Sequence, residues 1–358
     1  MALTNAAQNA PSTSSNKQAY QNTNNTTQGP NMTSSQERLV IPRPFAAYDQ
    51  ARKPIRAPTE AAFTSTFGAL LPSASFLKTD TGNVAYYPLP PSQPGSDKTT
   101  LDRVLFLHGV QTSALGMLPL VRGLHPSFPS SHFVLVDWYG HGLSDTPFVP
   151  HIPELFHKLI DALLDRLNWP SAHLVGYSFG GATTVGYVGS RPSRVSSFVL
   201  IAPAGLLRAS DFSAEHLRGD DEVAAHKYVV DCLEGGPLVV PTDWKQRVAK
   251  GEVVAPAIRE WEMREHAGHT ASIVAILRDG GAMARQDEFA KAASMGIPSV
   301  VVLGALDDVC SKQDLTGLGF TDVAVVSQVG HGLVRERVPE VAALIGDFWR
   351  SLAKEDRA

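Results

Sequence analysis

The residues most able to do chemistry surround Ser178. It stands in the run Gly176-Tyr177-Ser178-Phe179-Gly180, which has the form G-x-S-x-G and directly follows the apolar residues 172–175. A strand that ends in this pattern and turns at once into a helix carries its serine on a sharp elbow, where small flanking residues are needed. Backbone N–H groups at the start of such a helix can stabilise an oxyanion. Ser178 is therefore a candidate nucleophile, but in a chain with 29 glycines the pattern alone is a moderate signal.

A base and an acid follow later in the chain. His331 comes after the apolar run 323–326, and Asp307 comes after the apolar run 299–303. A neutral imidazole can take the proton of a serine hydroxyl, and a carboxylate can orient that imidazole. The order serine, aspartate, histidine, with each residue just past a predicted strand, is the order that a nucleophile elbow requires. The spacing predicts a triad of Ser178, Asp307 and His331.

The elements that must position these residues alternate along the chain. Apolar runs that read as strands buried on both faces are separated by segments of helical periodicity, which predicts a mostly parallel α/β sheet with helices on both faces. A hairpin is expected at 75–89, further strands at 103–107, 132–137, 172–175, 195–202, 298–303 and 322–327, and helices at 153–169 and 339–353.

Two regions interrupt this rhythm. Residues 1–37 are mostly Asn, Gln, Ser and Thr, too polar to bury a core, and are predicted to be a disordered tail. Residues 206–296 show recurring helical stretches and no convincing strand, which predicts a helical cap inserted between two parts of the core, 38–205 and 297–358. At least one helix of that insertion must be an ordinary crossover between strands.

Composition excludes several classes of function. The formal net charge of −4 offers no basic face for nucleic acid. No apolar run is long enough to span a membrane, and the first residues lack the pattern of a secretory signal, so a cytoplasmic location is expected. Cys232 and Cys310 favour free thiols, and no spacing indicates a metal site or another cofactor.

Over residues 75–355 the chain resembles the α/β-hydrolase family, in its lid-bearing members. His108-Gly109-Val110 is similar to the family's H-G-x turn, and residues 137–144 are similar to its D-x-x-G-x-G-x-S loop. The resemblance implies an eight-stranded, mostly parallel sheet and an oxyanion hole formed by the N–H groups of Val110 and Phe179. The family's G-x-x-D pattern, placed on Gly304, selects Asp307 rather than the adjacent Asp308 as the acid.

Other side chains near these motifs have competing interpretations. Tyr177 and Trp138 are candidate walls of a substrate pocket, although aromatic packing explains Tyr177 equally well. His108 and His141 are expected to be structural rather than catalytic. For Trp261, Met263, His266 and His269 in the predicted cap, core packing and surface polarity are favoured over lining an acyl pocket.

The type of nucleophile narrows the reaction. A serine at position 178 differs from the aspartate of epoxide hydrolases and haloalkane dehalogenases, and Gly332-Leu333 after His331 differs from the aromatic residue usual in meta-cleavage-type hydrolases. Hydrolysis of a small-molecule carboxylic ester or lactone through an acyl-enzyme is the favoured function. Perhydrolase, acyltransferase or carbon–carbon bond chemistry on the same triad, and a non-catalytic binding protein, remain alternatives. The substrate and the oligomeric state cannot be derived from the sequence.

Overall fold

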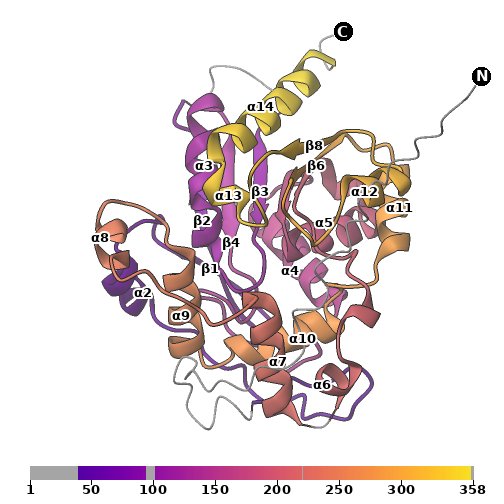
Figure 1. Ribbon diagram of the computed structural model, residues 1–358. Coiled ribbons are helices and arrows are strands. Elements are labelled where there is room, and N and C mark those ends of the chain that lie inside the picture. The colour runs from indigo at the N-terminus through magenta and orange to yellow at the C-terminus, as the bar shows by residue number, and fades with distance from the viewer. Residues whose placement is uncertain (1–38, 94–100, 220, 356–358) are drawn as a thin grey trace, which may run out of the picture.

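The structure, a computed structural model, describes residues 39–93, 101–219 and 221–355 (Figure 1). The predicted tail of residues 1–37 lies outside the described residues. Among the helices of the described ranges, none combines the length and the apolar character needed to cross a bilayer. The expected cytoplasmic location stays a prediction.

The core is one eight-stranded sheet with the order β1-β2-β4-β3-β5-β6-β7-β8. The first pairings, β1 with β2 and β2 with β4, are antiparallel, and all later pairings are parallel. This confirms the predicted α/β fold with a mostly parallel sheet. The strands are β1 (Ser75–Thr79), β2 (Gly82–Leu89), β3 (Arg103–Leu107), β4 (His132–Val136), β5 (Ala172–Tyr177), β6 (Val195–Ile201), β7 (Ser299–Gly304) and β8 (Val323–Val326).

Continuous apolar runs form these strands because both faces of the sheet are covered. Along β3, Leu105 and Leu107 pack into one core cluster, whereas Val104 and Phe106 pack into the other. Successive side chains of a strand point to opposite faces, so an alternating polar pattern would leave one of these clusters without apolar contacts.

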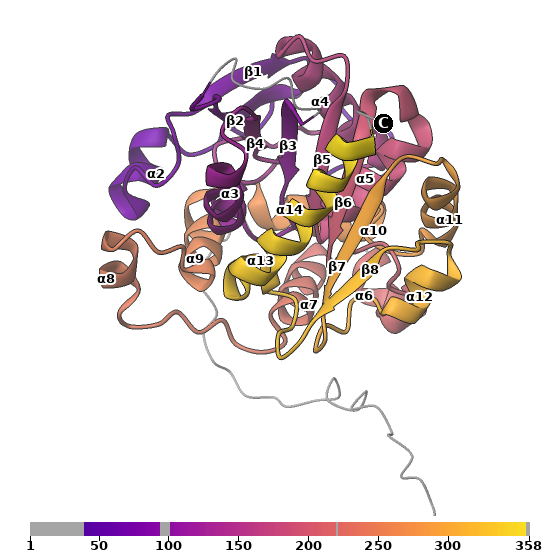
Figure 2. The ribbon, with the colours of Figure 1, turned by 90° about the horizontal axis from the view of Figure 1, so that it is seen from above.

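Two helical layers cover the sheet, as Figure 2 shows from above. Helices α3, α13 and α14 lie over one face, and α4, α5 and α11 lie over the other. Their bounds are α3 (Leu118–Leu124), α4 (Pro153–Arg166), α5 (Phe179–Ser190), α11 (Gln286–Ser294), α13 (Leu333–Glu336) and α14 (Val338–Glu355), with α12 (Lys312–Gly317) beside β8 and α2 (Glu60–Phe67) at the cap side. Short 3₁₀ turns occupy Ala114–Met117, His125–Ser127, Pro192–Arg194 and Ala209–Asp211.

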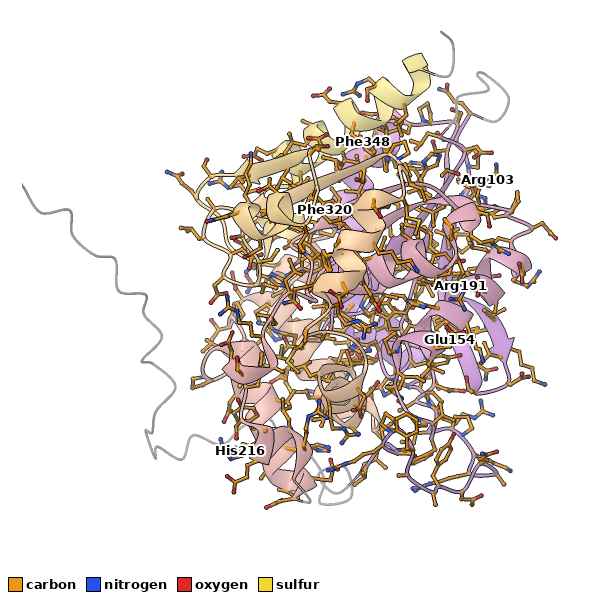
Figure 3. The ribbon with its side chains drawn as sticks, turned by 90° about the vertical axis from the view of Figure 1, so that its right-hand side faces the viewer. Arg103, Glu154, Arg191, His216, Phe320 and Phe348 are labelled. Atoms are coloured by element: carbon orange, nitrogen blue, oxygen red, sulfur yellow. The ribbon has the colours of Figure 1, made fainter. Side chains whose placement is uncertain are left out.

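Three charged residues tie α4 and α5 together. Arg191, just after α5, donates at 2.8 Å to Glu154 on α4, and Figure 3 labels both residues. Arg191 also donates at 2.6 Å to Asp161 on the same helix. This half-buried contact gives Arg191 a structural role at the C-terminal end of α5, whereas Ser178 precedes the N-terminal end.

Between β6 and β7 the described residues form helices and no named strand. They are α6 (Ala214–Arg218), α7 (Glu222–Glu234), α8 (Trp244–Ala249), α9 (Ala255–Glu265), α10 (His269–Asp279) and α11. A parallel bridge joins Leu207 to Met283, so the two ends of the insertion meet before α11 begins. Helix α11 packs against α5 as a crossover helix does. We call α6–α10 the cap helices; the division of the chain into core and cap stays a prediction.

The cap helices lie over the loops that follow the parallel strands. Glu234 at the end of α7 contacts Gln111 in the loop after β3, and Glu262 of α9 contacts Gly142 in the loop after β4. The described residues 39–59 run along the same region. Ile41 packs against α10, and Arg43 donates hydrogen bonds to the carbonyl groups of residues 218 and 219 at the end of α6.

Candidate active site

Ser178 occupies the sharp turn between β5 and α5. Its backbone has φ 54° and ψ −116°, a positive φ that side-chain-bearing residues rarely adopt. Its N–H donates to Ile201 at 3.0 Å, and its carbonyl accepts from Gly181 and Ala204 at 2.9 Å each. The strand-to-helix turn predicted from the sequence is present, and hydrogen bonds on both sides of the serine hold its unusual backbone in place.

Glycines beside Ser178 allow a close approach of three backbone segments. A Cβ at Gly180 would overlap the carbonyl group of Leu107 at the end of β3, and a Cβ at Gly176 would overlap the carbonyl group of Gly180. Neither obstacle is a flexible side chain, so a larger residue would displace the turn. The glycines of the G-x-S-x-G pattern therefore serve packing at the elbow.

The His331 imidazole lies between Ser178 and Asp307. Its Nε2 is 2.9 Å from Ser178 Oγ, and its Nδ1 is 3.0 Å from Asp307 Oδ2. The Asp307 side chain is fully buried and also accepts the N–H of Val309 through Oδ1, whereas the His331 side chain is 37% exposed. Asp308 is exposed. Loops after β5, β7 and β8 thus bring together the three predicted residues at hydrogen-bonding distances.

Tyr177 holds the loop that carries His331. Its hydroxyl donates to the His331 carbonyl oxygen at 2.9 Å, and the two rings lie 5.2 Å apart between centroids. Burial raises the pKa of the Tyr177 hydroxyl, which therefore remains a donor at neutral pH. The residue predicted to wall a pocket contacts the base itself, through both its ring and its hydroxyl.

The two candidate oxyanion donors lie close to the nucleophile. Phe179 is the first residue of α5, and Val110 follows Gly109, whose backbone presses so closely on Ser178 that a Cβ there would be 2.8 Å from Ser178 Cβ. Within the described part of the chain, neither the Val110 nor the Phe179 N–H has a hydrogen-bond acceptor. Both groups are therefore free to bind an oxygen atom near Ser178 Oγ.

Trp138 takes a position deeper than the sequence indicates. Its side chain has no exposed surface and packs edge-on against Phe156 and Phe179. Its indole N–H donates to the His108 carbonyl oxygen at 2.7 Å, and its backbone N–H donates to His108 Nε2 at 3.0 Å. Trp138 therefore supports Phe179 from behind and has no surface with which to line an accessible pocket in this structure.

Four further histidines form a buried group where the cap helices meet the loops after β3 and β4. The rings of His108, His141, His269 and His266 follow one another at centroid distances of 5.3, 4.7 and 6.2 Å, and each is at most 1% exposed. Burial lowers the pKa of all four, to about 3 for His108 and His269. They are neutral at physiological pH. Among the residues that the structure describes, no three His, Cys, Asp or Glu side chains are grouped to hold a metal ion.

The loop at 137–144 is organised by its first and last residues. Asp137 is fully buried and accepts hydrogen bonds from Tyr87 and from the backbone of Ala114 and Leu143, and burial raises its pKa to about 6. The Ser144 hydroxyl donates back to the Asp137 carbonyl oxygen at 2.8 Å. These contacts shape the loop beside the site, away from the reacting atoms.

Two contacts around the site could not be read from the sequence. Tyr177 is the neighbour of the nucleophile, but nothing in the spacing indicates its bond to His331. Gln111 lies next to Val110 and contacts Glu234, 123 positions away. Such contacts depend on the path of the chain in space, so no periodicity or motif could have identified them.

Comparison with known proteins agrees with this architecture. Residues 102–223 match the family model described as the alpha/beta hydrolase fold. A monoacylglycerol lipase, ABHD6 of Rattus norvegicus, is 24% identical over 274 residues, which cover 71% of this chain and 77% of that lipase.

Solved structures share the fold over most of the chain. A putative lipase from Acinetobacter baumannii superposes with a TM-score of 0.60 at 16% identity, covering 85% of this chain and 99% of the lipase. An enol-lactonase from Burkholderia xenovorans superposes with a TM-score of 0.57 at 18% identity, covering 76% of this chain and 99% of the lactonase. With the sheet order and the turn at Ser178, these similarities show that the chain has the alpha/beta hydrolase fold.

Proposed function

We propose that the protein is a serine hydrolase that cleaves a carboxylic ester or lactone through an acyl-enzyme on Ser178. One observation carries the proposal: His331 lies within hydrogen-bonding distance of both the Ser178 hydroxyl, at 2.9 Å, and the Asp307 carboxylate, at 3.0 Å. A nucleophile and a base within such reach, with a third group orienting the base, are the parts that acyl transfer requires.

The first half of the reaction forms the acyl-enzyme. His331 Nε2 takes the proton of Ser178 as Oγ attacks the carbonyl carbon of the substrate. The N–H groups of Val110 and Phe179 bind the negative charge that develops on the carbonyl oxygen, and the loss of one such donor costs about 3 kcal/mol. Asp307 accepts from Nδ1, which fixes the imidazole tautomer and stabilises the imidazolium. The imidazolium then protonates the departing alkoxide.

The second half releases the acid. His331 takes a proton from a water molecule, whose oxygen attacks the acyl carbonyl while the same two N–H groups bind the oxyanion. Collapse of this intermediate breaks the bond to Ser178 Oγ, which recovers its proton from His331. No cofactor takes part in either half.

The names of similar proteins support esters and lactones as the substrate class. A lipase and an enol-lactonase are among the proteins that share the fold. Both substrate classes present a carbonyl with an oxygen leaving group, which fits the proton donation that His331 would supply. In a lactone the leaving alkoxide stays tethered to the acyl group, and the chemistry at Ser178 is otherwise the same.

Replacement of Ser178 by alanine tests the proposal. We expect Ser178→Ala to abolish the hydrolysis of p-nitrophenyl acetate and labelling by a fluorophosphonate probe, because the attacking oxygen is missing. The circular dichroism spectrum should match that of the wild type. Undiminished turnover in this folded variant would contradict the proposal, and product analysis with an alcohol acceptor present would separate hydrolysis from acyl transfer.

A further inference from the structure

A polar chain connects the oxyanion turn to two cap helices. Gln111 directly follows Val110, and its Nε2 donates to Glu234 Oε1 at 2.7 Å. Glu234 is the last residue of α7, and its Oε2 lies 3.2 Å from the Nη2 of Arg259 on α9. We call Gln111, Glu234 and Arg259 the cap clamp. It is the point where a loop that carries a candidate oxyanion donor is held by the cap.

The position of Glu234 is a costly one for a carboxylate. Its side chain is only 3% exposed, and burial raises its pKa. It also stands at the C-terminal end of a helix, where the helix dipole disfavours negative charge. Arg259 and Gln111 lower its pKa and offset the effect of burial in part. A buried carboxylate that depends on two partners holds them in a defined geometry, because the loss of either leaves it unpaired.

Gln111 itself has a strained backbone. Its φ of 68° lies in the left-handed region, which residues other than glycine rarely adopt because it is strained. The side chain is nearly buried, and its bond to the Glu234 carboxylate is charge-assisted and therefore among the stronger kinds of hydrogen bond. The contact with the cap thus stabilises a backbone conformation that the chain would otherwise avoid.

Contacts on both sides of Val110 hold its backbone in place. On one side the backbone of Gly109 presses against Ser178, and on the other side Gln111 is tied to Glu234. The direction of the Val110 N–H depends on the backbone angles of this short segment. An oxyanion donor contributes most when it is preorganised toward the place where charge develops.

We propose that the cap clamp positions the Val110 N–H for catalysis, so that the cap helices influence the chemical step without touching the reacting atoms. The inference rests on the proposed function of Ser178 and Val110. Gln111, Glu234 and Arg259 are positioning residues, and their contribution belongs to the transition state. Removal of one of them should reduce kcat and leave KM unchanged, because the oxyanion forms only during the reaction.

Single and double substitutions test the clamp in the full-length protein. With p-nitrophenyl acetate as substrate, Gln111→Ala and Glu234→Ala should each lower kcat about tenfold, less than the loss of a whole oxyanion donor, because the N–H is misdirected rather than removed. The double variant should be no slower than the slower single variant, because both substitutions break the same connection. Asp231→Asn is the matched control: it lies on the same helix, and its pair with Lys227 is exposed. It should leave kcat unchanged.

An exchange of the two residues distinguishes positioning from general stability. In the variant with Gln111→Glu and Glu234→Gln, the hydrogen bond between positions 111 and 234 can re-form with its donor and acceptor reversed, and kcat should recover above that of either single variant. Additive losses, a change confined to KM or to the unfolding midpoint, or an exchange variant no faster than the single ones would overturn the inference. Wild-type protein without Ser178-dependent turnover would instead contradict the proposed function, and this inference with it.

Discussion

Two histidine environments in this molecule differ in their solvent access and in their hydrogen-bond partners. His331 is partly exposed and contacts a hydroxyl and a carboxylate, at 2.9 and 3.0 Å. The group of His108, His141, His266 and His269 is buried, and each of its members has a ring nitrogen near a backbone carbonyl oxygen. The partners and the solvent access of an imidazole therefore decide whether it can act as a base. A buried imidazole with a carbonyl partner stays neutral and serves as a hydrogen-bonding part of the core.

The largest expected effect separates His331 from His269. His331→Gln should lower kcat for p-nitrophenyl acetate by a factor on the order of 10⁶, because it removes the imidazole that lies 2.9 Å from the Ser178 hydroxyl and would take its proton. His269→Gln should leave kcat close to the wild-type value, since an amide can still donate to the Gly140 carbonyl oxygen. Steady-state kinetics on both variants, with circular dichroism as the check of folding, makes the comparison. Equal losses in the two variants would show that the buried histidines take part in the chemistry.

The next effect separates two adjacent aspartates. Asp307→Asn should lower kcat by about 10⁴, because the amide cannot hold His331 in the tautomer that accepts the Ser178 proton. Asp308→Asn should have little effect, since this residue is exposed and the carboxylate bonded to His331 is that of Asp307. The two variants carry the same chemical change at neighbouring positions, so each controls for the other. A larger loss in Asp308→Asn would mean that the wrong carboxylate has been paired with His331.

Local patterns in the sequence were sufficient to predict most strands of the core. The strand at 103–107 coincides with its predicted run, and the strand at 172–177 contains the predicted run 172–175, because a strand buried on both faces is apolar over most of its length. The elbow could be predicted since its glycines and its serine are contiguous, and the order of Ser178, Asp307 and His331 follows from the ends of strands that meet at one edge.

Contacts between distant segments could not be predicted in this way. Gln111 and Glu234, or Tyr177 and the His331 carbonyl oxygen, are polar pairs whose partners lie far apart in the chain. Trp138 was a candidate pocket wall, but its ring is fully buried against Phe156 and Phe179. No periodicity records how a loop crosses a sheet edge, so these residues become visible only in three dimensions.

The smallest effect measures the burial of His269 through the pH dependence of stability. Because burial lowers its pKa to about 3, the unfolded chain binds a proton at this histidine between about pH 6.5 and 3, and the folded chain does not. The free energy of unfolding therefore falls as the pH falls through this range. His269→Gln removes one such site and should flatten the slope by up to about 1.4 kcal/mol per pH unit. Urea unfolding of both proteins at several pH values measures this difference, which should be constant above pH 7.5. If the unfolding free energies of the two proteins ran parallel down to pH 4, His269 would be accessible to protons in the folded state. His269 and His331 would then differ only in their hydrogen-bond partners.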